Sequence, residues 1–220
     1  RHGIDRTILV QAAPTEAETR FLLDIAARTA FVVGVVGWAD LEAPDAPARI
    51  AALAADPLLV GLRPMAQDIP DLGFLGRPEL APALAAMVAH SLAFDALIKA
   101  EHIPATLALL AREPQLTVVI DHGAKPDLVT GDLAAWREGL KALAAHPQTV
   151  CKLSGLVTEA GPDWSLDTLQ PVVDHLLMTF GPQRLIFGSD WPVVTLRAPY
   201  ERWFDAAQTL LDVCSEDERA

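Results

Sequence analysis

Short apolar runs of the kind that form buried strands alternate with helical segments along the whole chain. Seven such runs predict strands, at residues 7–12, 31–38, 60–63, 93–98, 116–121, 150–153 and 185–187. Several runs are almost continuously apolar, as in parallel strands that are buried on both faces of their sheet. This alternation predicts an α/β protein with a parallel sheet.

Two of the intervening segments have clear helical spacing. In residues 132–145 the apolar side chains recur on one face, and Asp132 is placed to cap the first turn. Residues 166–180 repeat the pattern and are followed by Gly181-Pro182, a pair that ends helices. We therefore expect a helix in each segment.

Polar or aromatic residues stand at the C-terminal end of one expected strand after another: Gln11, Trp38, Arg63, Asp121, His122, Lys152 and Asp190. A doubly wound open sheet and a closed barrel both fit seven strand–helix units. The barrel is favoured because the active sites of (β/α)8 barrels lie at this face. No G-x-G-x-x-G motif follows an early strand, which disfavours a dinucleotide-binding fold. We predict a TIM-type (β/α)8 barrel.

The two ends of the chain account for the missing eighth strand. Arg1-His2-Gly3 has the form of a last helical turn with Gly3 as its stop. Ser215-Glu216-Asp217-Glu218 has the S-x-x-E form of a capping box that opens a helix. We expect a single domain over residues 1–220 that lacks the first strand–helix unit and the last helix. The alternative is a complete, shorter protein with frayed ends.

Composition excludes several classes of partner. With 220 residues and 51% hydrophobic residues, the chain can bury one large core. Its net charge of −12 disfavours nucleic acids and anionic membranes, which require basic surfaces. No apolar run reaches the roughly 18 residues of a membrane span. Cys151 and Cys214 are too few for a disulfide framework, so we expect buried thiols in a soluble cytoplasmic protein.

Asp190 is the first candidate for chemistry. It follows an apolar strand through Gly188-Ser189 and precedes Trp191-Pro192, so its carboxylate is presented where a strand ends. A carboxylate there can take a proton from water or bind a metal ion. His122 occupies the equivalent position after Val118-Val119-Ile120-Asp121. Asp190 as a helix cap and His122 as a structural residue are the alternatives, and Asp121 either orients His122 or contacts solvent or a helix.

Charged residues could add substrate contacts near the same face. Arg63 can hold a carboxylate or a carbonyl through paired hydrogen bonds, and Lys152 can act as a point charge. Asp95 lies inside an expected strand, so it should have a partner such as Arg63 or Lys152. A structural ion pair is the alternative role for each cation.

Two tryptophans complete the candidate site. Trp38 and Trp191 could form apolar pocket walls, although simple packing explains them equally well. We expect the other four histidines to be structural or surface residues: His90, His102, His146 and His175.

Taken together, these blocks resemble a known family. They are Val60-Gly61-Leu62-Arg63 with Gln67-Asp68, Phe94-Asp95, the segment from Val119 to Pro126, the segment from Val150 to Leu156, and Phe187-Gly188-Ser189-Asp190-Trp191-Pro192. In this order they are similar to the amidohydrolase-related lactonases, the branch of the amidohydrolase superfamily that includes L-fuconolactonases and pyrone-dicarboxylate lactonases. The resemblance runs along nearly the whole chain.

The resemblance implies a hydrolase that opens the lactone ring of a sugar acid or a related small molecule. Asp190 then corresponds to the strand-eight Asp that acts as general base, and His122 to the strand-six His beside it. Arg63 and Lys152 then correspond to substrate-facing positions. Trp38, Trp191 and Asp95 are the further candidate substrate-binding residues, from their own places in the sequence. A metal-dependent decarboxylase of the same superfamily and a non-catalytic barrel fragment are the alternatives, and a homo-oligomer is possible.

Two departures from the family pattern bear on metal binding. The first-strand H-x-H pair is absent from this chain, and Asp95 stands near the position where binuclear relatives carry a metal-binding His. A binuclear site is therefore not expected. The implied cofactor is none or one divalent ion such as zinc, with Asp190 and His122 as its candidate ligands.

Overall fold

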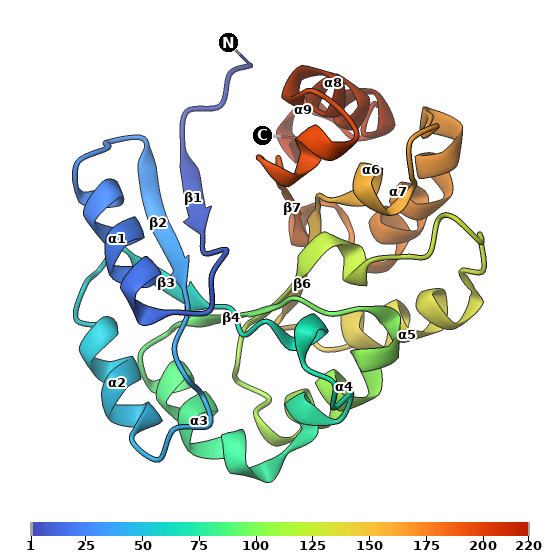
Figure 1. Cartoon of the computed structure of the whole chain (residues 1–220). Helices are drawn as coiled ribbons and strands as arrows, with labels where there is room; N and C mark the ends of the chain where they lie inside the picture. Colours follow the sequence, from blue (N-terminus) through green and yellow to red (C-terminus); the bar gives the residue numbers. More distant parts are fainter. Residues whose placement is uncertain (1, 220) are drawn as a thin grey trace. The chain divides into compact units, whose positions relative to one another are not determined.

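The computed structural model describes residues 2–219, and these fall into two compact units. The first unit contains the described residues up to Leu97, together with Ala105–Val118. The second contains Ile98–Pro104 and the described residues from Val119 onward. Strands and helices alternate along both units, as Figure 1 shows. Both units are therefore of the α/β class.

The first unit is a parallel sheet with helices packed on it. Its strands pair in sequence order, with Val10 opposite Val36, Gly37 opposite Leu62, and Leu62 opposite Phe94. They are β1 (Thr7–Val10), β2 (Val32–Gly37), β3 (Leu59–Leu62) and β4 (Ala93–Ala96). The helices are α1 (Glu16–Ala27), α2 (Ala46–Leu53), α3 (Ala81–Ala89) and most of α4 (Ile103–Arg112), with 3₁₀ turns at Ala66–Asp68, Phe74–Gly76 and Pro78–Leu80.

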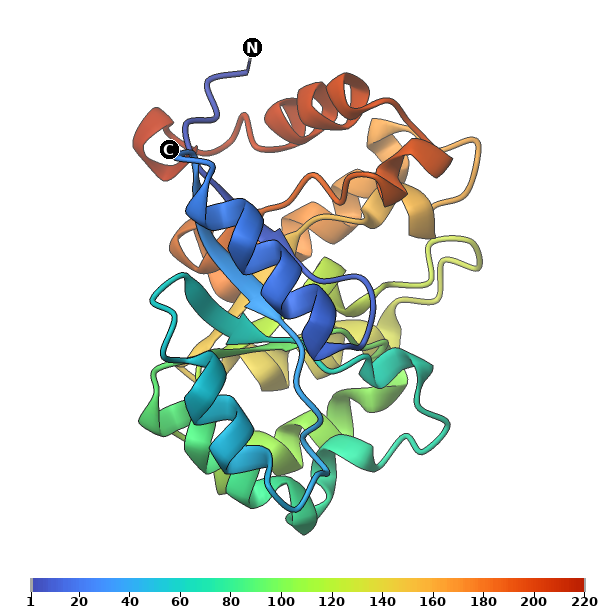
Figure 2. The same ribbon diagram turned by 60° about the vertical axis from the view of Figure 1, so that its left-hand side comes forward.

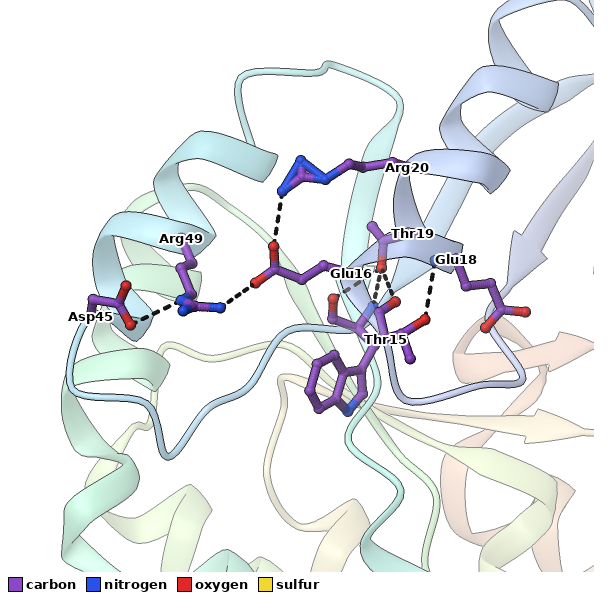
Figure 3. Close-up of polar contacts among 8 residues, drawn as sticks. Thr15, Glu16, Glu18, Thr19, Arg20, Asp45 and Arg49 are labelled. Atoms are coloured by element: carbon purple, nitrogen blue, oxygen red, sulfur yellow. Dashed lines mark hydrogen bonds and ion pairs between the residues drawn. The ribbon is translucent and has the colours of Figure 1, made fainter.

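The start of α1 is fixed to the end of β2, and Figure 3 shows this region. Thr15 caps α1 by accepting a hydrogen bond from the backbone N–H of Glu18 at 3.2 Å. The hydroxyl of Thr19 accepts from the N–H of Trp38 at 2.8 Å and donates to the Trp38 carbonyl at 2.9 Å. As a result α1 lies along β2 (Figure 2). The two hydrogen bonds to Thr19 also hold the backbone of Trp38, the first residue after β2.

The second unit contains β6 (Thr149–Leu153) and β7 (Leu185–Phe187), which are parallel with Leu153 opposite Phe187. It also contains the last two residues of β5 (Val118–Ile120). Its helices are α5 (Ala134–Ala144), α6 (Leu156–Glu159), α7 (Leu166–Phe180), α8 (Tyr200–Leu210) and α9 (Glu216–Arg219), with 3₁₀ turns at Ala100–His102, Asp121–Ala124, Pro182–Arg184 and Val193–Leu196.

The helices α5 and α7 contact each other in the second unit. The ring centroids of Trp136 and His175 are 5.1 Å apart. The Trp136 indole N–H also donates a hydrogen bond to the Gly123 carbonyl at 2.6 Å. His175 Nε2 donates to the Arg137 carbonyl at 3.1 Å. These contacts tie α5 and α7 to the segment that follows β5.

The expected secondary structure is confirmed with small shifts. Each of the seven expected strands is present within two residues of its predicted bounds, and the helix over residues 166–180 has the predicted bounds. The predicted cap at Asp132 is wrong, because α5 begins at Ala134 with Leu133 at its N-cap. The Asp132 carboxylate still accepts a hydrogen bond from the Ala134 N–H at 3.3 Å, one position outside the cap.

The predictions at the chain ends have mixed outcomes. His2 and Gly3 are not helical, so the predicted last helical turn is wrong for these residues, and Arg1 lies outside the described part of the chain. The capping box is confirmed, since Ser215 and Glu218 exchange hydrogen bonds at the start of α9. A single domain over residues 1–220 stays a prediction.

The two cysteines also agree with expectation. Cys151 and Cys214 are buried and free. Between His2 and Arg219, none of the helices has the length and the apolar character needed to cross a membrane.

Candidate active site

The chain takes an uncommon conformation directly after β5. Four consecutive residues have positive φ angles: His122 at 53°, Gly123 at 58°, Ala124 at 55° and Lys125 at 48°. Residues other than glycine rarely adopt this left-handed region, and each costs about 1–3 kcal/mol. Such strain persists only where surrounding contacts hold it, and it is concentrated at functional sites. The turn after β5 is therefore a candidate for function.

The His122 ring has a polar neighbour at each of its two nitrogens. Its Nδ1 lies 2.8 Å from the hydroxyl of Ser154, and its Nε2 lies 3.8 Å from a carboxylate oxygen of Asp190. The His122 and Asp190 side chains are only 12% and 14% exposed. The distance of 3.8 Å is longer than a hydrogen bond, so the ring and the carboxylate interact here by charge and dipole. The two main candidate residues are thus brought together.

The backbone near Asp190 is fixed on both sides. The N–H of Gly188 donates to the Leu153 carbonyl at 3.1 Å, which continues the pairing of β7 with β6. The Gly188 carbonyl accepts from the Trp203 indole at 2.9 Å. Asp190 has a φ of 54°, and its carbonyl accepts from the Val194 N–H at 2.8 Å. Its carboxylate is therefore presented by a second strained, well-anchored residue.

Lys152 forms an ion pair with Asp121. Its ammonium lies 2.6 Å from the Asp121 carboxylate, whose side chain has no exposure, while 15% of the Lys152 side chain is exposed. Lys152 is the penultimate residue of β6, so it lies at the C-terminal end of this strand as predicted. The pair gives Asp121 a partner that the sequence did not indicate, because Asp121 was expected to orient His122 or to contact solvent or a helix.

Sequence reasoning missed two residues that contact the His122 ring. Ser154 bonds the imidazole, and Gly155 lies against the ring. Sequence reasoning also missed the partly buried ion pair between Lys125 and Glu159, which are 3.5 Å apart. The position of Ser154 directly after β6 was the available signal, since residues at strand ends build the sites of parallel α/β folds.

The remaining candidates of the first unit also lie at or near strand ends. Gln11 is completely buried, and its amide donates to the Arg63 carbonyl at 2.8 Å, while the Arg63 guanidinium donates back to the Gln11 carbonyl. Trp38 is half-buried, and Asp95 lies inside β4 with 1% exposure. The assignment of Arg63, Trp38 and Asp95 to substrate binding stays a prediction.

Trp191 directly follows Asp190 and is 66% exposed, which suits a side chain that contacts a ligand.

Cys151 precedes Lys152 in β6 and is fully buried. Burial raises the pKa of its thiol far above the ordinary range. A thiolate nucleophile at Cys151 is therefore disfavoured.

His122 and Asp190 supply two metal-binding side chains. A catalytic zinc site uses three protein ligands and a water molecule. Within residues 2–219, no cluster of three or more His, Cys, Asp or Glu residues is arranged to hold a metal ion. The described residues therefore do not by themselves form a complete site for zinc.

The strand-and-helix order and the paired His122 and Asp190 are those of a barrel hydrolase, and comparison with known families agrees. The family model described as "Amidohydrolase" matches residues 1–220, so the chain belongs to the amidohydrolase family. An L-fucono-1,5-lactonase from Burkholderia ambifaria is 53% identical over 196 residues, which is 89% of this chain and 68% of that protein. An L-fucono-1,5-lactonase from Burkholderia multivorans is 40% identical and covers 93% of this chain and 75% of its own length.

A solved structure confirms the fold class. The crystal structure of a Burkholderia multivorans amidohydrolase with bound zinc has a TM-score of 0.92 and 38% identity, and the match covers 98% of this chain and 78% of that chain. The fold is therefore that of an amidohydrolase TIM-type barrel, with seven of its strands among the described residues. Both the predicted fold class and the predicted family are confirmed.

Proposed function

We propose that this protein hydrolyses the lactone ring of a sugar acid, with Asp190 as the general base. The observation that carries the proposal is the Asp190 carboxylate, held 3.8 Å from His122 Nε2 by two strained strand-end segments. The two Burkholderia relatives described as L-fucono-1,5-lactonases support it, and they favour lactone hydrolysis over decarboxylation. An aldono-1,5-lactone similar to theirs is the proposed substrate.

The proposed reaction begins with proton transfer from water to the Asp190 carboxylate. The resulting hydroxide attacks the lactone carbonyl carbon and forms a tetrahedral oxyanion. His122 Nε2–H and the Lys152 ammonium stabilise this oxyanion by hydrogen bonding and charge. Collapse of the intermediate breaks the ring C–O bond, and the departing alkoxide takes the proton from Asp190. The product is the open hydroxy acid, and Asp190 is ionised again.

The other predicted residues would hold the sugar. Trp191 is exposed beside Asp190 and can pack its ring against the apolar face of a sugar. We assign Arg63, Trp38 and Asp95 to contacts with the ring hydroxyls or the carbonyl. A guanidinium and a carboxylate at strand ends suit a ligand that carries many hydroxyl groups.

Replacement of Asp190 by Asn tests the proposal. Asn keeps the shape of Asp but cannot accept the proton, so we expect kcat on L-fucono-1,5-lactone to fall about 100- to 10,000-fold. The assay follows acid release in the full-length protein over a panel of aldonolactones. Asp205→Asn, a substitution in α8, is the matched control and should keep wild-type activity. Normal activity in Asp190→Asn would show that the general base is another group.

A bound metal ion is tested separately. Asp190 and His122 offer only two of the ligands that zinc requires, so no step of the reaction is assigned to a metal. Elemental analysis of the purified protein measures zinc directly. One zinc per chain, with activity lost on chelation and restored by zinc, would add a metal ion to the site. Size-exclusion chromatography and cell fractionation test the expected oligomer and cytoplasmic location.

A further inference from the structure

Ser154 contacts the nitrogen of His122 that faces away from Asp190. Its hydroxyl lies 2.8 Å from His122 Nδ1, and the residue is 1% exposed. It directly follows β6, whereas His122 follows β5, so the contact joins two strand ends. A hydroxyl can either donate to Nδ1 or accept from it. Which of the two occurs decides which ring nitrogen carries the proton of neutral His122.

Close backbone packing fixes the imidazole in this position. A Cβ atom on Gly155 would lie 2.7 Å from His122 Nδ1 and 2.8 Å from Cγ, so the ring rests directly on the Gly155 backbone. A Cβ atom on Gly188 would lie 2.8 Å from the Ser154 Cβ, so Ser154 rests on Gly188 in the same way. Neither the ring nor the hydroxyl has room to move toward these backbones. The Ser154–His122 contact is therefore well defined.

The charge of Asp190 selects between the two tautomers. His122 Nε2 faces the Asp190 carboxylate at 3.8 Å. If Nδ1 carried the proton, the lone pair of Nε2 would point toward an anion, which is repulsive. If Nε2 carries it, an N–H dipole faces the carboxylate, which is attractive in a partly buried site. The second arrangement requires the Ser154 hydroxyl to donate to Nδ1.

We propose that Ser154 is a positioning residue that fixes neutral His122 as the Nε2–H tautomer. Its catalytic meaning rests on the proposed lactonase function, because Nε2–H is the donor that would face the developing oxyanion. Without the Ser154 hydroxyl, Nδ1 has lost its donor. The proton can then occupy either nitrogen, and a share of the molecules presents no donor toward Asp190.

Nitrogen-15 NMR of the full-length protein with labelled histidine tests the tautomer directly, at neutral pH and without substrate. The His122 signals are assigned as those missing from His122→Gln. We expect the wild type to have a protonated Nε2 and an unprotonated, hydrogen-bonded Nδ1. A wild type with the proton on Nδ1, or on both nitrogens, would overturn the proposal even if no Ser154 variant folds.

Ser154→Ala then tests the role of the hydroxyl. We expect its His122 signals to move toward a mixture of tautomers, with kcat lower by about 10- to 100-fold and KM within about threefold of wild type. Ser154→Thr keeps the hydroxyl and should retain the wild-type tautomer. Unchanged His122 signals in Ser154→Ala would refute the assignment.

Thr149→Val is the matched control. Thr149 is a fully buried residue at the other end of β6, and its hydroxyl donates to the Leu143 and His146 carbonyls at 2.7 Å. Its loss should lower stability while leaving the His122 signals and kcat unchanged. If the wild type hydrolyses no lactone, the kinetic comparison fails with the proposed function, whereas the NMR result still decides the tautomer.

Discussion

Lys152→Met removes the ammonium that lies 2.6 Å from the fully buried Asp121 carboxylate. Breaking a buried ion pair from one side costs about 3–5 kcal/mol, because the remaining charge is left in a poorly solvated place. Since 15% of the Lys152 side chain is exposed, some water reaches the pair, and we expect a loss of about 3 kcal/mol. For a chain of this size the loss corresponds to a decrease in Tm of about 6–12 °C.

Urea denaturation of the full-length protein, followed by circular dichroism, measures the free energy of unfolding. The matched control is Lys125→Met, because the Lys125–Glu159 pair is longer, at 3.5 Å, and its side chains are 20% and 28% exposed. Its removal should cost no more than about 1 kcal/mol. Adding Asp121→Asn to Lys152→Met completes a double-mutant cycle, which should give a coupling energy of about 2–3 kcal/mol.

The refuting result is equally specific. If Lys152→Met destabilises the protein no more than Lys125→Met does, then the buried Asp121 carboxylate does not depend on Lys152. A coupling energy near zero in the cycle would lead to the same conclusion. The role of Lys152 would then lie in the proposed reaction alone, and its loss would appear in kcat rather than in stability.

Two further substitutions test the site and the interior. Gly155→Ala places a Cβ atom 2.7 Å from His122 Nδ1, so kcat should fall at least about 10-fold. Gly131→Ala has a similar φ of 72° but open space around it, so it should lose about 1–2 kcal/mol of stability and keep its activity. Gly155→Ala should lose more stability than this, because the clash adds to the backbone strain. Burial lowers the pKa of His175 in the folded protein below its ordinary value of about 6.5. As the pH falls, the unfolded chain therefore binds a proton at this residue before the folded chain does. The free energy of unfolding should then decrease as the pH drops from about 7.5 through 6.5. His175→Gln keeps a donor for the Arg137 carbonyl but cannot bind the proton. Urea denaturation at pH 5 to 7.5 should show that its free energy of unfolding varies less with pH than that of the wild type. An unchanged pH dependence would mean that His175 does not contribute.

The secondary structure could be predicted well because it depends on local patterns. Buried parallel strands require continuous apolar runs, so β7 was predicted with its observed bounds from Leu185 to Phe187. The helix α7 was equally clear, since its apolar side chains recur on one face and Gly181-Pro182 follows its last turn. Its cap at Ser165 is seen only in the structure. The cap of α5 was misplaced at Asp132, because a single residue of displacement changes no periodic pattern.

The sequence by itself also determined where chemistry should be sought. Asp190 and His122 were identified because each follows an apolar strand, and the functional residues of parallel α/β folds gather at the C-terminal ends of strands. Only the tertiary structure decided their partners. The contacts of His122 with Ser154 and Asp190, and of Lys152 with Asp121, join residues that are far apart in the sequence. No local pattern encodes such distances, because they depend on how β5, β6 and β7 align when the chain packs.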